Sequence, residues 1–105
     1  MATILPEISI IIHKYIARVQ KEKQFIKAYL YGSYAKGTAG KWSDIDVAIV
    51  SPDFFEDLFE ERVGLMKMAM MVDERIEPIP FRPEDFTSSY CNFRLAKFML
   101  IFSWL

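Results

Sequence analysis

The sequence predicts an α/β (α+β) fold in which a small mixed β-sheet has helices packed against it. Stretches with apolar residues at helical spacing alternate with short stretches rich in aromatic and branched residues, in the order helix, strand, strand, helix, strand, helix. This order favours a mixed sheet covered by helices. The 105 residues suit one domain, and no repeat or linker divides the chain, so we expect a single domain over residues 1–105.

Residues 6–23 form the first predicted helix. Pro6 suits its first turn, and the apolar residues that recur at helical spacing are Ile8, Ile11, Ile12, Tyr15, Ile16 and Val19. His13 falls on the polar side of this helix, where no second ligand-type residue accompanies it. We therefore interpret His13 as solvent-exposed and not as a metal ligand.

Three strands are predicted, at residues 25–31, 44–50 and 75–81, because these stretches are apolar and bounded by turn residues. In the third stretch, Pro78 and Pro80 lie two residues apart, so both missing N–H groups face the same neighbour. A strand that cannot donate along one side belongs at the edge of a sheet. We therefore place the second strand in the centre, between the first and the third.

A second long helix is predicted to start at Ser51-Pro52-Asp53, with Asp53 and Glu56 as a capping box, and to end near residue 72. We interpret the methionine cluster of residues 66–71 as core packing and not as a binding surface.

The C-terminal part is predicted to be an apolar helix over residues 87–105, opened by Pro83, Glu84 and Asp85. Residues 98–105 contain one polar residue, Ser103. This tail is too short to span a bilayer and too apolar for a lone surface helix. We expect it to be buried in a groove, in a homodimer or against a partner.

Composition excludes several classes of function. Thirteen Lys and Arg balance fourteen Asp and Glu, so there is no direct evidence for a nucleic-acid-binding face. Cys91 is alone, which excludes a disulfide framework and a cysteine metal cluster. No apolar run is long enough for a membrane span, and the N-terminus has no basic leader. We therefore expect a cytoplasmic protein.

The strongest functional signal combines Gly32-Ser33 with Asp44-Ile45-Asp46 ten residues later. On a strand, residues two apart share a face, so the two aspartates lie together while Ile45 faces the core. Two unpaired carboxylates repel each other, but Mg²⁺ binds carboxylates and bridges them to phosphates. The alternative is a solvated sheet face. The glycine and serine upstream favour a magnesium site.

The Gly32-Ser33 pair is interpreted as a nucleotide phosphate-binding turn. Gly32 permits unusual dihedral angles and close backbone approach, and Ser33 with the following amides can donate hydrogen bonds to phosphate oxygens. By itself the pair would indicate an ordinary turn. Lys36 or Lys41 would be available to neutralise phosphate, although loop lysines are usually only solvated.

A third carboxylate is expected from the strand beside the second one. Glu77 is our first choice because it lies inside the predicted strand, where it can point toward the aspartates. Asp73 has the same parity and Glu74 is close, so both stay open as alternatives. The sequence thus predicts Asp44 and Asp46 as catalytic and metal-binding residues with Glu77 as the favoured third acid, and paired Mg²⁺ ions can stabilise the attacking and leaving oxygens at such a site.

These residues resemble the minimal nucleotidyltransferases of the DNA polymerase beta superfamily. The resemblance rests on Gly32-Ser33, on Asp44 and Asp46, and on the strand Arg75-Ile76-Glu77-Pro78, and it covers residues 5–86. It implies a palm-like fold, two metal ions held by three acids, and attack on the α-phosphate of an NTP with loss of pyrophosphate. It also implies that Asp44 and Asp46 bind metal. Glu77, at a position where many relatives have aspartate, would then orient or activate the attacking hydroxyl.

Among such enzymes, the chain looks like the single-domain antitoxins that are encoded beside HEPN-type partner proteins. The resemblance implies ATP as the NTP and AMP transfer to a hydroxyl of the partner. A small-molecule acceptor would need residues that this short chain lacks. The rival hypothesis is a non-catalytic binding module that neutralises its partner by forming a complex, with a homodimer through the C-terminal segment as a further arrangement.

Overall fold

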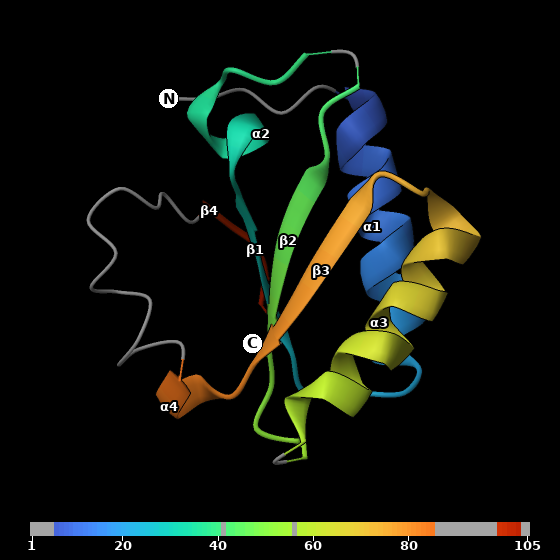
Figure 1. Ribbon diagram of the computed structural model, residues 1–105, viewed down its shortest axis with the longest axis vertical. Coiled ribbons are helices and arrows are strands. Elements are labelled where there is room, and N and C mark those ends of the chain that lie inside the picture. Colours follow the sequence, from blue (N-terminus) through green and yellow to red (C-terminus); the bar gives the residue numbers. More distant parts are fainter. Residues whose placement is uncertain (1–5, 41, 56, 86–98, 104–105) are drawn as a thin grey trace.

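The computed structural model describes residues 6–40, 42–55, 57–85 and 99–103 (Figure 1). The elements are α1 (Pro6–Gln20), β1 (Lys27–Tyr31), α2 (Ser33–Lys36), β2 (Ile45–Val50), α3 (Leu58–Val72), β3 (Ile76–Phe81), α4 (Pro83–Asp85) and β4 (Met99–Ser103).

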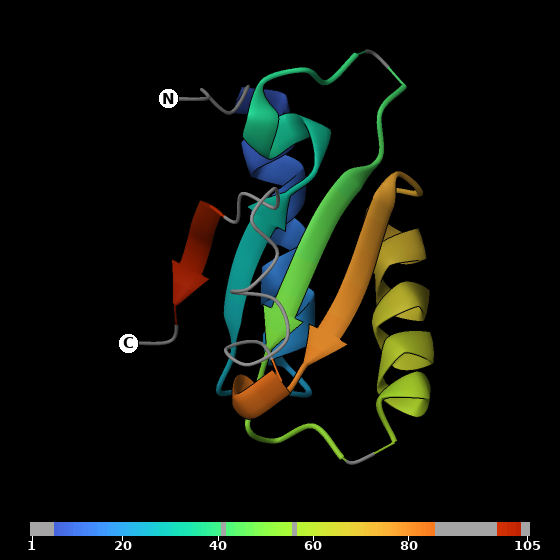
Figure 2. The same cartoon turned by 60° about the vertical axis from the view of Figure 1, so that its left-hand side comes forward.

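The sheet has the strand order β3-β2-β1-β4. β1 is antiparallel to β2 and to β4, whereas β2 and β3 are parallel and are connected through α3. The predicted mixed sheet is therefore confirmed, as is the position of β2 between β1 and β3. β3 lies at one edge, as its prolines predicted. In Figures 1 and 2, α1 and α3 lie on the same side of this sheet.

The main core lies between that side of the sheet and the two long helices. Ile45, Val47 and Ile49 of β2 are fully buried there, as the alternating pattern predicted. Tyr15 of α1 is also fully buried, and its hydroxyl donates a hydrogen bond of 3.1 Å to the carbonyl oxygen of Leu65 in α3. Burial raises the pKa of Tyr15 well above its usual value, so the hydroxyl keeps its proton.

The second long helix begins later than the sequence predicted. Its N-cap is Asp57, whose side chain accepts hydrogen bonds from the amides of Phe59 and Glu60. The predicted start at Asp53 is wrong for the described residues 53–55, which are not helical. Instead, the Asp53 amide donates to Ser51 Oγ at 3.1 Å, which closes a local turn.

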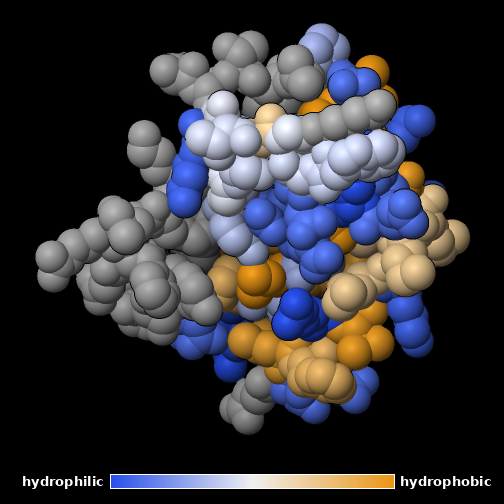
Figure 3. Space-filling model, turned by 45° about the horizontal axis from the view of Figure 1, so that its top comes forward, coloured by the Kyte–Doolittle hydropathy of each residue, from blue (hydrophilic) through white to orange (hydrophobic). Residues whose placement is uncertain are grey.

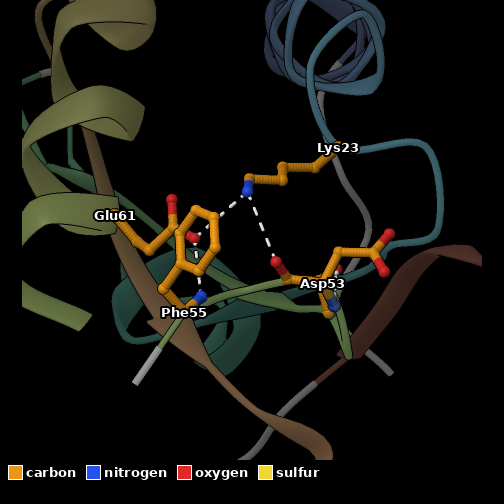
Figure 4. A network of polar contacts seen from close by, with 5 residues as sticks. Lys23, Asp53, Phe55 and Glu61 are labelled. Carbon is orange, nitrogen blue, oxygen red and sulfur yellow. Dashed lines mark hydrogen bonds and ion pairs between the residues drawn. The ribbon is translucent and has the colours of Figure 1, made fainter. Parts of the chain in front are cut away.

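A tertiary contact holds this turn outside the helix (Figure 4). Lys23 Nζ lies 3.2 Å from Glu61 Oε2 and donates to the carbonyl oxygen of Asp53 at 3.3 Å. Glu61 Oε2 also accepts from the amide of Phe55 at 2.9 Å, and the Lys23 ammonium lies 4.8 Å from the centre of the Phe55 ring. These contacts join the end of α1 to the β2–α3 loop and stabilise its non-helical path.

The methionine cluster of α3 is only partly in the core. Met68 is 6% exposed, but Met70 and Met71 are 73% and 72% exposed. Met66 is also exposed, at 36%, so core packing was the wrong interpretation for Met66, Met70 and Met71. The sequence could not separate them because α3 is apolar on several faces, and only the placement of the sheet decides which face is covered.

The apolar tail is a strand and not the predicted helix over its described residues. β4 pairs with β1, with Ala28 opposite Phe102 and Tyr29 opposite Leu100, and a β-bulge at Ile101 interrupts the register. Ile101 and Phe102 pack against the main core, while Leu100 is 53% exposed. Pairing with β1 gives the backbone of the tail hydrogen-bond partners and packs Ile101 and Phe102 against the core, whereas a lone helix with apolar residues on all sides would leave much of its apolar surface in water. Of the predicted C-terminal helix, residues 83–85 form α4, and residues 86–98, 104 and 105 lie outside the described part.

None of the helices within the described ranges is long and apolar enough to cross a membrane. His13 is exposed, and its Nδ1 lies 2.7 Å from the carbonyl oxygen of Ser9 in the same helix, in agreement with its interpretation as a surface residue.

Candidate active site

The turn after β1 forms one wall of the candidate site. β1 ends at Tyr31, Gly32 has φ +73°, and Ser33 begins the short helix α2. The sequence predicted a loop here, because four residues are too few to show a helical period. Lys36 donates its amide to the Gly32 carbonyl oxygen at 3.1 Å, and Thr38 donates to Ser33 at 2.9 Å. These hydrogen bonds fix the turn. Glycine is favoured at position 32 because other residues adopt this positive φ only at a cost in energy.

Gly32 contacts Asp46 of the neighbouring strand. Tyr31 is opposite Asp46 in the β1–β2 register, so Gly32 follows directly beside the carboxylate. A Cβ atom on residue 32 would lie 3.0 Å from Asp46 Cγ and would overlap with its Oδ2. The Gly-Ser turn and the aspartate strand, separated by ten residues in sequence, are therefore in contact.

Asp46 also lies directly beside Glu77. The two residues are opposite each other in the parallel register of β2 and β3. Ile45 and Ile76, the residues that precede them, are buried in the main core, so Asp46 and Glu77 belong to the sheet face turned away from the two long helices. Asp44, two residues before Asp46, is exposed at the start of β2.

The three carboxylates form an uncompensated negative site. Partial burial raises the pKa of Asp46, and the nearby charges of Asp44 and Glu77 raise it further. Within the part of the chain that the structure describes, no hydrogen bond or ion pair reaches the side chains of these three residues. Like charges without a counterion are unfavourable in a folded protein, so this arrangement favours binding of a cation.

The donor set fits magnesium in its chemistry. Carboxylate oxygens are the ligands that Mg²⁺ prefers, and the ion usually uses one or two protein carboxylates together with substrate phosphates. Among the described residues, no three acidic, histidine or cysteine side chains are arranged as a complete metal site. Asp46 and a neighbouring carboxylate would supply the one or two protein ligands that such an ion uses.

The two alternatives to Glu77 have different surroundings. Asp73 binds Arg75 through two side-chain hydrogen bonds of 3.1 and 3.0 Å, and these bonds lower the pKa of Asp73. Glu74 is exposed and precedes the strand. Only Glu77 lies inside β3 and opposite Asp46.

Apolar side chains lie beside the carboxylates on the same sheet face. Ala48, Val50 and Phe81 form a second buried cluster with Tyr29, Tyr31 and Ile79 packed against it. In Figure 3, hydrophilic side chains gather in the middle of the visible face and hydrophobic ones lie below them. Lys36 is exposed at the end of α2, and Lys41 lies outside the described residues. The ion pair of Asp73 with Arg75 was not predicted, since Asp73 was considered only as an alternative third acid, although a spacing of two residues allows the two side chains to meet.

A comparison with protein families identifies the fold and the type of chemistry. The family model described as "Nucleotidyltransferase domain" matches residues 12–87, well over half of the chain and a range that includes Gly32, Ser33, Asp44, Asp46 and Glu77. No curated protein and no solved structure matches the chain significantly. The α/β fold with its mixed sheet is consistent with this match, and the chain belongs to the nucleotidyltransferase domain family.

Proposed function

We propose that this protein transfers a nucleoside monophosphate, AMP from ATP, to a hydroxyl group of a partner protein in a magnesium-dependent reaction. The family match supports nucleotidyl transfer in general. The observation that carries the finer proposal is the position of Asp46, which contacts Gly32 on one side and lies opposite Glu77 on the other. Asp46 thus lies between the proposed phosphate-binding turn at Gly32 and the acidic side chain of Glu77.

In this proposal each residue has a separate role. Asp44 and Asp46 hold magnesium, with Glu77 as the third acid, and the metal supplies charge stabilisation for the phosphates when it is bound. Gly32 leaves room for close approach of the triphosphate, and Ser33 donates a hydrogen bond to a phosphate oxygen. Glu77 orients the acceptor hydroxyl and receives its proton. The acceptor oxygen forms a bond to the α-phosphorus, the bond between that phosphorus and the bridging oxygen breaks, and pyrophosphate leaves.

A protein acceptor is supported by the apolar outer surface of α3. Phe59, Met70 and Met71 are each more than 70% exposed, which favours contact with another protein. We propose a HEPN-type partner, so that the chain acts as the antitoxin of a toxin–antitoxin pair. A homodimer through the C-terminal segment is the other arrangement, and it would use the exposed Leu100 of β4.

Transfer of α-labelled phosphate tests the proposal. The purified chain is incubated with Mg²⁺, each of the four α-³²P-labelled NTPs in turn, and a HEPN-type protein encoded next to it. We expect labelling of the partner with ATP, and loss of at least two orders of magnitude in rate for Asp46→Asn, since a lost metal ligand costs several kcal/mol of transition-state stabilisation. Glu22→Gln, which changes an exposed acid after α1, is the matched control and should label normally.

Equal labelling by wild type and Asp46→Asn would contradict the assigned role of Asp46. A stable complex that forms without any labelling, in wild type and variant alike, would instead support the non-catalytic binding module. Glu77→Gln should reduce the rate of transfer more than the affinity for ATP. Normal transfer by Glu77→Gln would move the role to Asp73 or Glu74, or remove the third acid from the mechanism.

A further inference from the structure

Arg75 is the cation closest in the register to the acidic site, yet it is bound elsewhere. Its carbonyl oxygen accepts the amide hydrogen of Ile45 at 2.7 Å, which continues the β2–β3 pairing and sets Arg75 beside Asp44. Arg75 lies in the turn that leads into β3, directly before its first residue Ile76, and Tyr34 and Glu7 are the other groups whose charges act on it besides Asp73. Neighbouring strands lie about 4.8 Å apart, a distance that an arginine side chain easily spans.

The Asp73 carboxylate holds the Arg75 guanidinium in a two-point ion pair. Arg75 Nε donates to Asp73 Oδ1 at 3.1 Å, and Nη2 donates to Oδ2 at 3.0 Å. Asp73 Oδ1 also accepts the backbone amide of Arg75 at 2.9 Å. The two side chains are 18% and 29% exposed, respectively, so solvent screens this pair less than a fully exposed one. In the described part of the chain, no ion pair joins Arg75 to Asp44, Asp46 or Glu77.

The alternative position of Arg75 would compete with a metal ion. A guanidinium pairs readily with two carboxylate oxygens, and Asp44, Asp46 and Glu77 offer several such oxygens that no side chain of the described residues binds. If the guanidinium bound there, it would occupy the same oxygens that a divalent cation needs. A divalent cation can therefore bind these oxygens only if another acid holds the Arg75 guanidinium away from them.

We propose that Asp73 is a positioning residue that keeps Arg75 away from Asp44, Asp46 and Glu77, so that these carboxylates stay available to a divalent cation. The inference rests on the proposed function, because it assumes that these acids bind metal. It assigns to Asp73 a role different from that of a third catalytic acid. Asp73 also fits this role by position, since it caps the end of α3 and its carbonyl oxygen accepts the amide hydrogen of Ile76 at 3.2 Å, which fixes its backbone.

Direct binding of Mn²⁺, measured by electron paramagnetic resonance in the absence of nucleotide, tests the inference. We expect Asp73→Asn to weaken Mn²⁺ binding about tenfold, because the freed guanidinium pairs with the site carboxylates. Asparagine keeps the Oδ1 acceptor for the Arg75 amide, so the turn is preserved. The double variant Asp73→Asn/Arg75→Gln should bind Mn²⁺ within about twofold of wild type, because the competing cation is gone.

Two further variants and one further measurement make each outcome interpretable. Asp46→Asn should bind no Mn²⁺ at the site, and if wild type and Asp46→Asn bind equally, both the proposed function and this inference are overturned. Lys23→Met removes an ion pair at the opposite end of the sheet and should not change Mn²⁺ binding. Thermal unfolding of every variant confirms that it is folded at the temperature of the titration.

Two outcomes would overturn the inference alone. In the first, wild-type binding depends on Asp46, but Asp73→Asn binds Mn²⁺ as tightly as wild type. In the second, Asp73→Asn binds weakly and the double variant is not restored, which indicates that Asp73 acts as a ligand or as a structural residue and not through Arg75.

Discussion

Gly32 and Asp46 are in direct contact, at the point where the turn after β1 meets the start of β2. The backbone of Gly32 has φ +73°, and a Cβ atom at this position would lie 3.0 Å from Asp46 Cγ. Glycine is thus needed here for two reasons: its dihedral angle and the space that the carboxylate occupies. The same contact couples the geometry of the turn to the position of the proposed metal ligand.

Replacing Gly32 by alanine should therefore damage both stability and the site. We expect a loss of about 1–3 kcal/mol in the free energy of unfolding, from the positive φ and from displacement of the Asp46 carboxylate. Urea denaturation measures this loss. The matched control is Gly64→Ala in α3, where an added Cβ would meet nothing within 4 Å. That variant should gain about 0.5–1 kcal/mol, because alanine favours a helix. Equal effects of the two substitutions would contradict the role of the Gly32–Asp46 contact.

Asp46→Asn should make the metal-free protein more stable at pH 7. The folded state raises the pKa of Asp46 through burial and through the charges of Asp44 and Glu77, so the folded protein binds this proton more tightly than the unfolded one. The favourable contribution of protonated Asp46 is complete below the unfolded pKa of 3.8 and is lost as pH rises through the folded pKa. Asparagine avoids this loss.

Thermal unfolding across pH 3–8 checks this expectation. The melting temperature of Asp46→Asn should exceed that of wild type at pH 7, and the difference should vanish toward pH 3. Added Mg²⁺ should raise the melting temperature of wild type but not of the variant, since only the wild type binds the ion. A variant less stable than wild type at pH 7 without metal would show that Asp46 has a favourable partner.

Tyr15→Phe should destabilise the protein without affecting the site. The substitution leaves the buried carbonyl oxygen of Leu65 without the Tyr15 hydroxyl donor, which should cost about 1–3 kcal/mol in urea denaturation. Rates of nucleotidyl transfer at a temperature where the variant is folded should equal those of wild type. A change in rate would mean that the packing of α1 on α3 influences the carboxylates.

Leu100→Glu should distinguish a role of β4 in association from its role in packing against the core. Leu100 is 53% exposed, so the substitution should change the free energy of unfolding by only about 0.5 kcal/mol. If the C-terminal segment mediates a homodimer, a buried charge at this position should convert the dimer into a monomer, as measured by light scattering. Deleting residues 99–105 should in contrast lower stability, because Ile101 and Phe102 pack against the main core. An unchanged oligomeric state in Leu100→Glu would contradict association through β4.

The sequence by itself determined the part of the fold that depends on local alternation. Asp44-Ile45-Asp46 was expected to present carboxylates on one face and Ile45 in the core, and Ile45 is fully buried. The prolines of β3 predicted its place at the sheet edge, because a missing N–H group is a local covalent property. The Gly-Ser turn was also readable, since the need for a positive φ is local. Whether Asp44, Asp46 and Glu77 are catalytic stays a prediction.

The tertiary structure decided what local patterns leave open. The helix α3 begins at Leu58 and not at the predicted Asp53. Lys23, thirty residues before Asp53 in the sequence, binds the carbonyl oxygen of Asp53 and holds the loop that precedes the helix. The apolar tail pairs with β1 as a strand because the edge of β1 presents backbone N–H and C=O groups that need partners. The contact of Gly32 with Asp46 became visible only in the structure, and the register of β2 and β3 placed Glu77, one of three acids that the sequence left open, opposite Asp46. Contacts between residues far apart in sequence depend on how the elements pack, and a single sequence encodes that packing without displaying it.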